Sequence, residues 1–210
     1  MEFKDRRDAG RVLAKALAAW RGRTDVVVLA LPRGGVPVAW EVAHFLNAPL
    51  DVLVVRKLGF PGQEELAMGA IASGGVRVMS ELPHSWPVSD ETLNAVVARE
   101  TAELLRREQL YRGERAPPVL AGRVVLLVDD GLATGATMHA AVLAARAAQP
   151  QCIVVAAPVA SPEAVRLLST VADEVVSVHT PELFRAVGLW YANFEQTGDE
   201  EVRRLLQDTG

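Results

Sequence analysis

Two hydrophobic patterns alternate along this chain. Short continuous runs rich in valine and leucine are typical of strands buried on both faces, and longer segments with apolar residues at helical spacing separate them. The expected strands lie at 26–31, 50–55, 124–128, 153–158 and 174–178, and the expected helices at 8–20, 36–46, 137–148 and from Pro162 onward. This alternation predicts an α/β fold, with a parallel sheet flanked by helices.

Two segments fall outside the alternation. Residues 59–118 contain glycines and prolines followed by a long charged helix at about 90–112, and residues 180–210 are rich in aromatic side chains. We interpret the first segment as a flap inserted into a core of about 1–58 and 119–179. The second is interpreted as a small C-terminal cap. A chain of 210 residues is long enough for one domain with these additions, so 1–210 is predicted to be a single domain.

Composition narrows the function classes. The chain is 50% hydrophobic and 23% charged with a net charge of -4, which argues against a nucleic-acid partner. Its single cysteine, Cys152, excludes an intrachain disulfide and favours a reducing compartment. The N-terminus lacks an apolar signal segment, and no apolar run approaches the ~20 residues that span a bilayer. We therefore expect a cytoplasmic protein without a membrane partner.

Chemically distinctive residues follow three of the expected strands. Ligands of parallel sheets bind outside the carboxyl ends of the strands, so these residues are candidates for one site. They are Arg33, Gly34 and Gly35 after 26–31, Arg56 and Lys57 after 50–55, and Asp129 and Asp130 after 124–128.

The acid pair opens the strongest motif. Two carboxylates at the end of a buried strand need compensation, which ribose hydroxyls and Mg²⁺ would supply. The small residues that follow, at the start of a helix, suit a phosphate group. The candidate ribose-phosphate site comprises Asp129, Asp130, Gly131, Ala133, Thr134, Gly135, Ala136 and Thr137, with Asp129 and Asp130 as the metal ligands. A metal-free acidic turn before a capped helix is the alternative.

Two other phosphate-handling classes fit this motif poorly. A Walker A loop is excluded because the loop lacks its lysine. A phosphatase of the Asp-x-Asp type is disfavoured because the acids are adjacent, and neighbours in a regular strand point to opposite faces.

A second anion site is predicted after the strand at 26–31. Arg33 offers a charged fork, while Gly34 and Gly35 expose backbone amides. Arg56 and Lys57 would add positive charge. A tight turn with a surface arginine and a solvated basic pair are the alternatives.

Residues 124–137 closely resemble the phosphoribosyl pyrophosphate (PRPP) motif of type I phosphoribosyltransferases, in which two acids precede Ala/Asp-Thr-Gly-x-Thr. The whole chain, including 65–72 and 186–191, looks most like an uncharacterised bacterial branch of that family. The resemblance implies that Asp129 and Asp130 hold the 2′ and 3′ hydroxyls and that residues 133–137 wrap the 5′-phosphate. It also implies that the second anion site, Arg33 to Gly35 with Arg56 and Lys57, binds pyrophosphate, and that the peptide between Pro32 and Arg33 is cis.

The resemblance further implies a reaction. The phosphoribosyl group would pass from PRPP to a nitrogen nucleophile, with Mg²⁺ as cofactor and Arg33, Lys57, Asp129 and Asp130 as catalytic residues. Enzymes for 6-oxopurines carry aspartate at the position of Ala133, so hypoxanthine and guanine are disfavoured. The acceptor is unidentified but nucleobase-like. A PRPP-binding regulator and a hydrolase are the alternative functions.

The flap and cap receive roles from the same resemblance. The candidates for a flap that closes over PRPP are Arg106, Tyr111 and Arg112. The alternative interpretation is a solvent-exposed helix with i,i+4 ion pairs and no role in the site. The candidates for acceptor binding are the cap residues Phe184, Val187, Trp190 and Tyr191. The alternative is that these side chains pack in the core or in a dimer interface. The oligomeric state stays open, with a homodimer among the alternatives.

Overall fold

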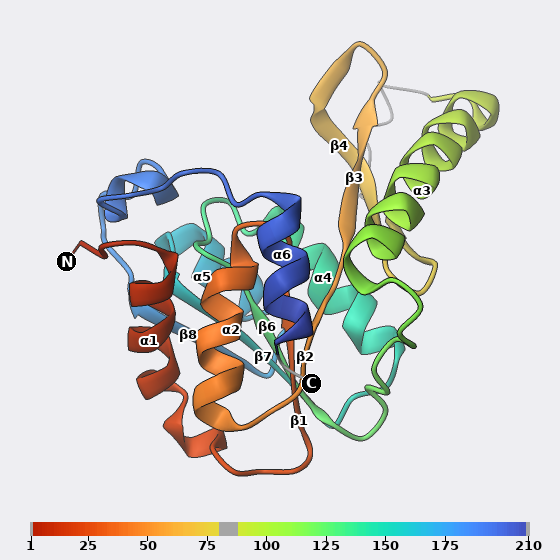
Figure 1. Ribbon diagram of the computed structural model, residues 1–210. Helices are drawn as coiled ribbons and strands as arrows, with labels where there is room; N and C mark the ends of the chain where they lie inside the picture. Colours follow the sequence, from red (N-terminus) through yellow and green to blue (C-terminus); the bar gives the residue numbers. More distant parts are fainter. Residues whose placement is uncertain (1, 80–87, 209–210) are drawn as a thin grey trace.

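A five-stranded parallel sheet forms the body of the protein (Figure 1). The computed structural model describes residues 2–79 and 88–208. The strand order is β2-β1-β6-β7-β8, with every neighbouring pair parallel. The strands are β1 (Val26–Ala30), β2 (Leu50–Val52), β6 (Val124–Val128), β7 (Cys152–Val159) and β8 (Glu174–His179). The predicted parallel α/β fold is confirmed.

Helices cover both faces of this sheet because successive residues of each buried strand point to opposite sides. Val28 and Leu126 face one layer, and Val27 and Leu127 face the other. The first layer contains α1 (Arg6–Ala16), α2 (Gly35–Leu46) and α6 (Asp199–Gln207), and the second contains α4 (Ala136–Ala147) and α5 (Pro162–Leu168). A 3₁₀ turn, η1 (Ala18–Trp20), ends the first predicted helix.

The flap is a second, antiparallel sheet with a long helix, and it projects from the body (Figure 1). Its strands are β3 (Val55–Phe60), β4 (Gln63–Ala72) and β5 (Val76–Met79), in the order β3-β4-β5. Helix α3 (Asp90–Arg112) confirms the predicted helix; Ser89 caps it by accepting a hydrogen bond from the N–H of Thr92. Residues 80–87 of the predicted flap lie outside the described residues.

The predicted strand at 50–55 is wrong in its extent. The N–H of Leu53 still donates to the carbonyl of Ala30, but that of Val54 donates to the hydroxyl of Ser73 in the flap. The chain therefore leaves the parallel sheet at this point, and Val55 begins β3. The continuous apolar run conceals the change because the residues on both sides of it are buried.

The C-terminal segment is more than a cap. A bridge between Phe3 and Tyr191 joins it to the N-terminus, and the short helix η2 (Val187–Trp190) precedes that bridge. Helix α6 then places Val202, Leu205 and Leu206 in the main core. The interpretation of 180–210 as a cap is therefore wrong for α6, which belongs to the helical layer.

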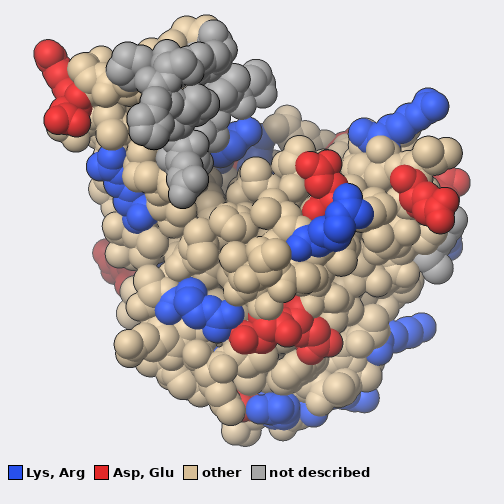
Figure 2. Space-filling view, turned by 180° about the vertical axis from the view of Figure 1, so that it is seen from behind, with Lys and Arg blue, Asp and Glu red and all other residues tan. Residues whose placement is uncertain are grey.

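The surface mixes charges of both signs. On the face shown in Figure 2, basic and acidic side chains lie interspersed on a largely uncharged surface. Within residues 2–79 and 88–208, no helix combines the length and the apolar character that crossing a membrane requires.

Candidate active site

The acid pair lies where β1 and β6 end, beside the longer strand β7. Asp129 and Asp130 follow β6 directly, and the N–H of Asp129 donates to the carbonyl of Ala156 in β7 at 3.3 Å. On the other side, the N–H of Leu31 after β1 donates to the carbonyl of Val128 at 2.9 Å. The edge of the sheet therefore brings the acid pair beside the loop that joins β1 to α2.

Few donors reach the two carboxylates. Asp129 accepts from the N–H of Asp130 at 2.8 Å, and Asp130 accepts from Nε of Arg6 at 2.7 Å. Burial raises the pKa of Asp129 well above its ordinary value, and the charge of Asp130 adds to that effect. Burial also raises the pKa of Asp130, although Arg6 opposes that shift. A desolvated acid pair of this kind favours a cation or hydroxyl donors as its ligand.

The expectation that the adjacent acids point to opposite faces is wrong. Both carboxylates face the β1–α2 loop: a Cβ atom added to Gly34 would lie 2.1 Å from Oδ2 of Asp130, and one added to Gly35 would lie 3.1 Å from Oδ1 of Asp129. The alternation rule fails because the pair lies beyond the last residue of β6, outside the regular strand. The pair can therefore act together on one ligand.

The phosphate loop follows the acid pair and opens α4. Ala133, Thr134 and Thr137 are exposed, whereas Gly135 is buried with a φ of 79°. A Cβ at Gly135 would lie 3.2 Å from that of Ala164, so both conformation and space favour glycine there. The loop places small exposed residues at a helix N-terminus, which is suited to an anion.

The β1–α2 loop approaches the acid pair very closely. The peptide between Pro32 and Arg33 is cis, as the resemblance implied. A Cβ at Gly35 would lie 2.7 Å from the backbone carbonyl of Val128, which is too close for any side chain. The predicted pyrophosphate loop therefore lies directly against the end of β6 and the acid pair.

The three predicted cations of the pyrophosphate site are not brought together. Nη1 of Arg33 lies 3.8 Å from Oδ1 of Asp199, with the arginine side chain 33% exposed. Arg56 donates through Nε and Nη2 to Glu100 of α3, at 2.9 and 2.6 Å. Lys57 follows Arg56 within β3, so its side chain points to the opposite face of the hairpin. The expectation that Arg56 and Lys57 end a strand of the parallel sheet is wrong.

Two of the predicted flap residues are anchored rather than solvated. Tyr111 is buried and donates its hydroxyl to Asp199 at 2.6 Å, and burial raises its pKa to about 12. Arg112, with only 9% of its side chain exposed, pairs with Asp51 at 3.1 Å and donates to the carbonyl of Val52. Together these contacts fix the end of α3 to the core and to α6.

The third predicted flap residue lies on the surface of α3. Arg106 is exposed and pairs with Glu103 at 2.8 Å. Arg107 pairs with the same carboxylate, which is the i,i+4 arrangement of a solvated helix. The hydrogen bonds from both arginines lower the pKa of Glu103 to about 2.

The four cap residues divide into two groups. Val187 and Tyr191 contact the acid loop: a Cβ at Gly131 would lie 2.4 Å from Cγ1 of Val187, and Tyr191 donates its hydroxyl to the backbone carbonyl of Asp130. Phe184, Val187 and Trp190 all pack against the cluster of Phe3, Ala9, Val159 and Tyr191, so Val187 and Tyr191 combine this packing with their contacts to the acid loop. Core packing thus describes Phe184 and Trp190.

Sequence reasoning missed Arg6 and Asp199. Arg6 pairs with Asp130 across 124 positions of sequence, and Asp199 accepts from Tyr111 across 88. Charged residues at helix starts are usually solvated, so neither position carries a local signal. Only the tertiary contacts identify them.

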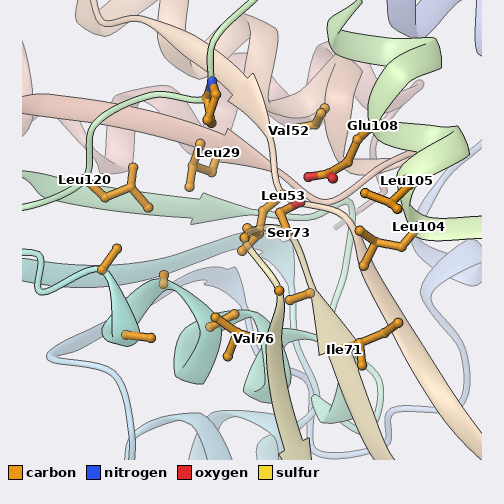
Figure 3. Close-up of a pocket in the computed structure, with 18 of the residues that line it drawn as sticks. Leu29, Val52, Leu53, Ile71, Ser73, Val76, Leu104, Leu105, Glu108 and Leu120 are labelled. Atoms are coloured by element: carbon orange, nitrogen blue, oxygen red, sulfur yellow. The ribbon is translucent and has the colours of Figure 1, made fainter. Parts of the chain in front are cut away.

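A large cavity lies elsewhere, between the flap and the core (Figure 3). Its volume is about 930 Å³, and its lining is mainly apolar, although the carboxylate of Glu108 points into it. The labelled apolar residues include Leu53, Ile71, Val76, Leu104 and Leu120. The first residue of α4 that lines the cavity is Ala144. At about 1.5 Å per residue it lies about 12 Å along the helix axis from Ala136, where α4 begins at the phosphate loop, so the cavity is separate from that loop. Arg112 is the one predicted site residue in its described lining.

Comparison with known proteins supports the family resemblance. Residues 4–189 match the family model described as the phosphoribosyl transferase domain. A protein of Mycobacterium tuberculosis with a provisional phosphoribosyl transferase name is 51% identical over 205 residues, in each of two strains. The match covers 97% of this chain but 46% of the relative, so the chain spans about half the length of the curated relatives it matches.

Solved structures share the fold. A crystal structure of a Thermus thermophilus protein has a TM-score of 0.87 and 46% identity, covering 99% of both chains. A Neisseria gonorrhoeae protein solved with bound ppGpp has a TM-score of 0.51 and 16% identity, covering 99% of this chain and 98% of its own. With the family model spanning most of the sequence and the predicted pyrophosphate loop lying against the acid pair, the chain belongs to the phosphoribosyl transferase domain family.

Proposed function

We propose that this chain transfers a 5-phosphoribosyl group from PRPP to a nitrogen nucleophile and releases pyrophosphate. The observation that carries the proposal is the contact of the acid pair with the β1–α2 loop, where a Cβ added to Gly35 would lie 2.7 Å from the backbone carbonyl of Val128 and 3.0 Å from Cα of Asp129. A carboxylate pair, a helix N-terminus and a glycine loop at one edge of the sheet match the hydroxyls, 5′-phosphate and diphosphate of PRPP.

Each part of PRPP has a proposed partner. The ribose hydroxyls would bind Asp129 and Asp130, the 5′-phosphate the loop at 133–137, and the diphosphate Arg33 with the amide of Gly34. The N–H of Gly35 donates to the carbonyl of Leu31 at 3.1 Å, so Gly35 would serve mainly by its lack of a side chain. Mg²⁺ fits this site because Asp129 and Asp130 are poorly compensated carboxylates that face the same loop. They would hold the ion jointly with the substrate, since Mg²⁺ usually combines one or two carboxylates with phosphate oxygens and water. When bound, the ion would supply positive charge against the diphosphate.

The proposed reaction exchanges one bond at the anomeric carbon. The bond to the diphosphate oxygen breaks, its electron pair leaves with pyrophosphate, and the acceptor nitrogen forms the new bond and loses its proton. The transition state of such a transfer resembles an oxocarbenium ion, so charge develops on the leaving group. Arg33 and the amide of Gly34 would stabilise that charge. Val187 lies beside Gly131 in the acid loop, which supports it as the cap residue that would contact an acceptor.

Calorimetry tests the proposal. Wild-type protein titrated with PRPP in the presence of Mg²⁺ should bind, and the double variant Asp129→Asn/Asp130→Asn should not bind detectably. The exposed acids Asp90 and Asp208 provide a matched control, because Asp90→Asn/Asp208→Asn removes the same charge away from the site. Absence of binding to the wild type, or equal binding by both double variants, would contradict the proposal.

A PRPP-binding regulator is the second candidate, favoured by one observation. Arg56 is paired with Glu100 within the flap, which leaves fewer cations for the leaving group than the sequence suggested. An acceptor screen that follows pyrophosphate release separates the cases. Release only with a nucleobase indicates transfer, release with ribose 5-phosphate and no acceptor indicates hydrolysis, and binding without release indicates a regulator.

A further inference from the structure

Arg6 lies inside the proposed substrate site although no motif marks it. Its Nε donates to Oδ2 of Asp130 at 2.7 Å, and the two side chains are only 12% and 14% exposed. A Cβ at Gly34 would lie 3.2 Å from the same Nε. The guanidinium therefore touches both the acid pair and the β1–α2 loop.

The cap holds Arg6 in this position. Nη1 donates to the backbone carbonyl of Glu195 at 2.6 Å, and the guanidinium carbon lies 4.0 Å from the centre of the Phe194 ring. The neighbouring Tyr191 packs against Phe194 at 5.0 Å and donates its hydroxyl to the backbone of Asp130. The adjoining rings of Tyr191 and Phe194 thus contact both Arg6 and the backbone of Asp130, with which Arg6 pairs.

We infer that Arg6 is a positioning residue that orients the Asp130 carboxylate for the ribose of Mg²⁺-bound PRPP, and that Phe194 and Glu195 hold Arg6 in place. The inference rests on the proposed function. Asp130 stands beside Asp129, and Arg6 is the described side chain that donates to it. Because one hydrogen bond fixes Oδ2, the direction of the other oxygen is fixed with it.

Arg7 offers a matched control on the same helix. It has the same kinds of contact, an ion pair with Glu41 and a ring contact with Trp40 at 4.0 Å, but it does not pair with Asp130. Arg6→Gln and Arg7→Gln therefore remove the same charge from neighbouring positions. Thermal unfolding of both variants reports on folding independently of the site.

The test measures two ligands by calorimetry with Mg²⁺ present. Arg6→Gln should weaken PRPP binding by about tenfold or more, the usual effect of losing a charge-assisted hydrogen bond to a buried group, and should change pyrophosphate binding by less than about twofold. Arg6→Lys should restore part of the PRPP affinity because it keeps the charge. Arg7→Gln should bind PRPP like the wild type.

Phe194→Leu extends the test without changing any charge. It should weaken PRPP binding by about two- to fivefold by removing the ring beneath the guanidinium. Should Arg6→Gln fail to fold, Phe194→Leu and Arg6→Lys decide the question, since PRPP affinity equal to wild type in both would overturn the inference.

Three results with Arg6→Gln would overturn the inference. Unchanged PRPP affinity would make Arg6 merely structural, and increased affinity would make it a competitor of the ligand. An equal loss of pyrophosphate binding would make it a diphosphate ligand. A wild type that does not bind PRPP would instead show failure of the proposed function itself, and the inference would fall with it.

Discussion

The sheet core and the flap are held together by different means. In the core, fully buried strands such as β1 and β6 pack against helices, and the site at their edge is shaped by backbone contacts at glycines. The flap joins the core partly through apolar side chains, since Met68, Ile71 and Leu104 belong to the same buried cluster as the strands of the main sheet. It is also joined by polar pairs, the buried pair of Arg112 with Asp51 and the hydrogen bond from the buried Tyr111 to Asp199. A mainly apolar cavity lies beside Arg112. The contrast teaches that the floor of the site is shaped by close backbone contacts, whereas the position of the flap depends on apolar packing around a cavity together with a few polar contacts.

The first prediction compares the same substitution in the two regions. Leu126→Ala, in the middle of β6, should destabilise the protein near the top of the range of about 2–5 kcal/mol that buried leucines show. Leu104→Ala should cost less, near the bottom of that range, because Leu104 already faces the cavity on one side. Denaturant unfolding measures the free energy of unfolding of both variants, and the comparison requires that their m-values be equal. Equal losses would mean that the flap is packed as tightly as the core.

The second prediction removes the ion pair at the base of the flap. Arg112→Met leaves Asp51 buried without its cation and should destabilise the protein by about 3–5 kcal/mol. Arg112→Met/Asp51→Leu should recover much of that loss, since burying two apolar groups leaves no unpaired charge. Arg106→Met, at an exposed pair on the same helix, should change stability by less than about 1 kcal/mol. If the double variant is no more stable than Arg112→Met, the stability depends on the specific contacts of the ion pair, and an apolar pair cannot replace them.

The sequence predicted the elements of the core more accurately than the start of the flap. The strand at 124–128 and the helix at 90–112 were predicted to the residue, because burial on both faces and a clear cap leave strong local patterns. The end of β2 was missed because the apolar run continues into the hairpin at Val55. Burial alone does not distinguish one sheet from another.

Within the candidate site, the sequence predicted some residues correctly and missed others. The acid pair and the glycine loop were predicted to lie together, because parallel topology places strand ends on one edge. Arg6 was missed, and Arg56 was placed at the wrong sheet, because both depend on contacts between distant segments. Orientation beyond a strand end is equally unpredictable, since Asp129 and Asp130 no longer follow the alternation of β6.

The last and smallest prediction concerns Tyr111, which links the flap to α6 through Asp199. Its pKa is raised from 10.0 to about 12, first by burial and then by the hydrogen bond to that carboxylate. The folded state therefore favours the protonated phenol, so the stabilisation is fully present below pH 10 and is lost as pH rises toward 12. Tyr111→Phe removes the hydrogen bond and should cost about 1 kcal/mol at pH 8.

The difference between wild type and Tyr111→Phe should then shrink as the pH of the unfolding experiment rises from 10 toward 12. Urea unfolding at pH 8, 10 and 11 measures it, and Tyr191→Phe is unsuitable as a control because that hydroxyl contacts the acid loop. A difference that stays constant across this range would mean that the phenol is not held by Asp199. The polar link between flap and α6 would then contribute little, and apolar packing of α3 would have to position the flap.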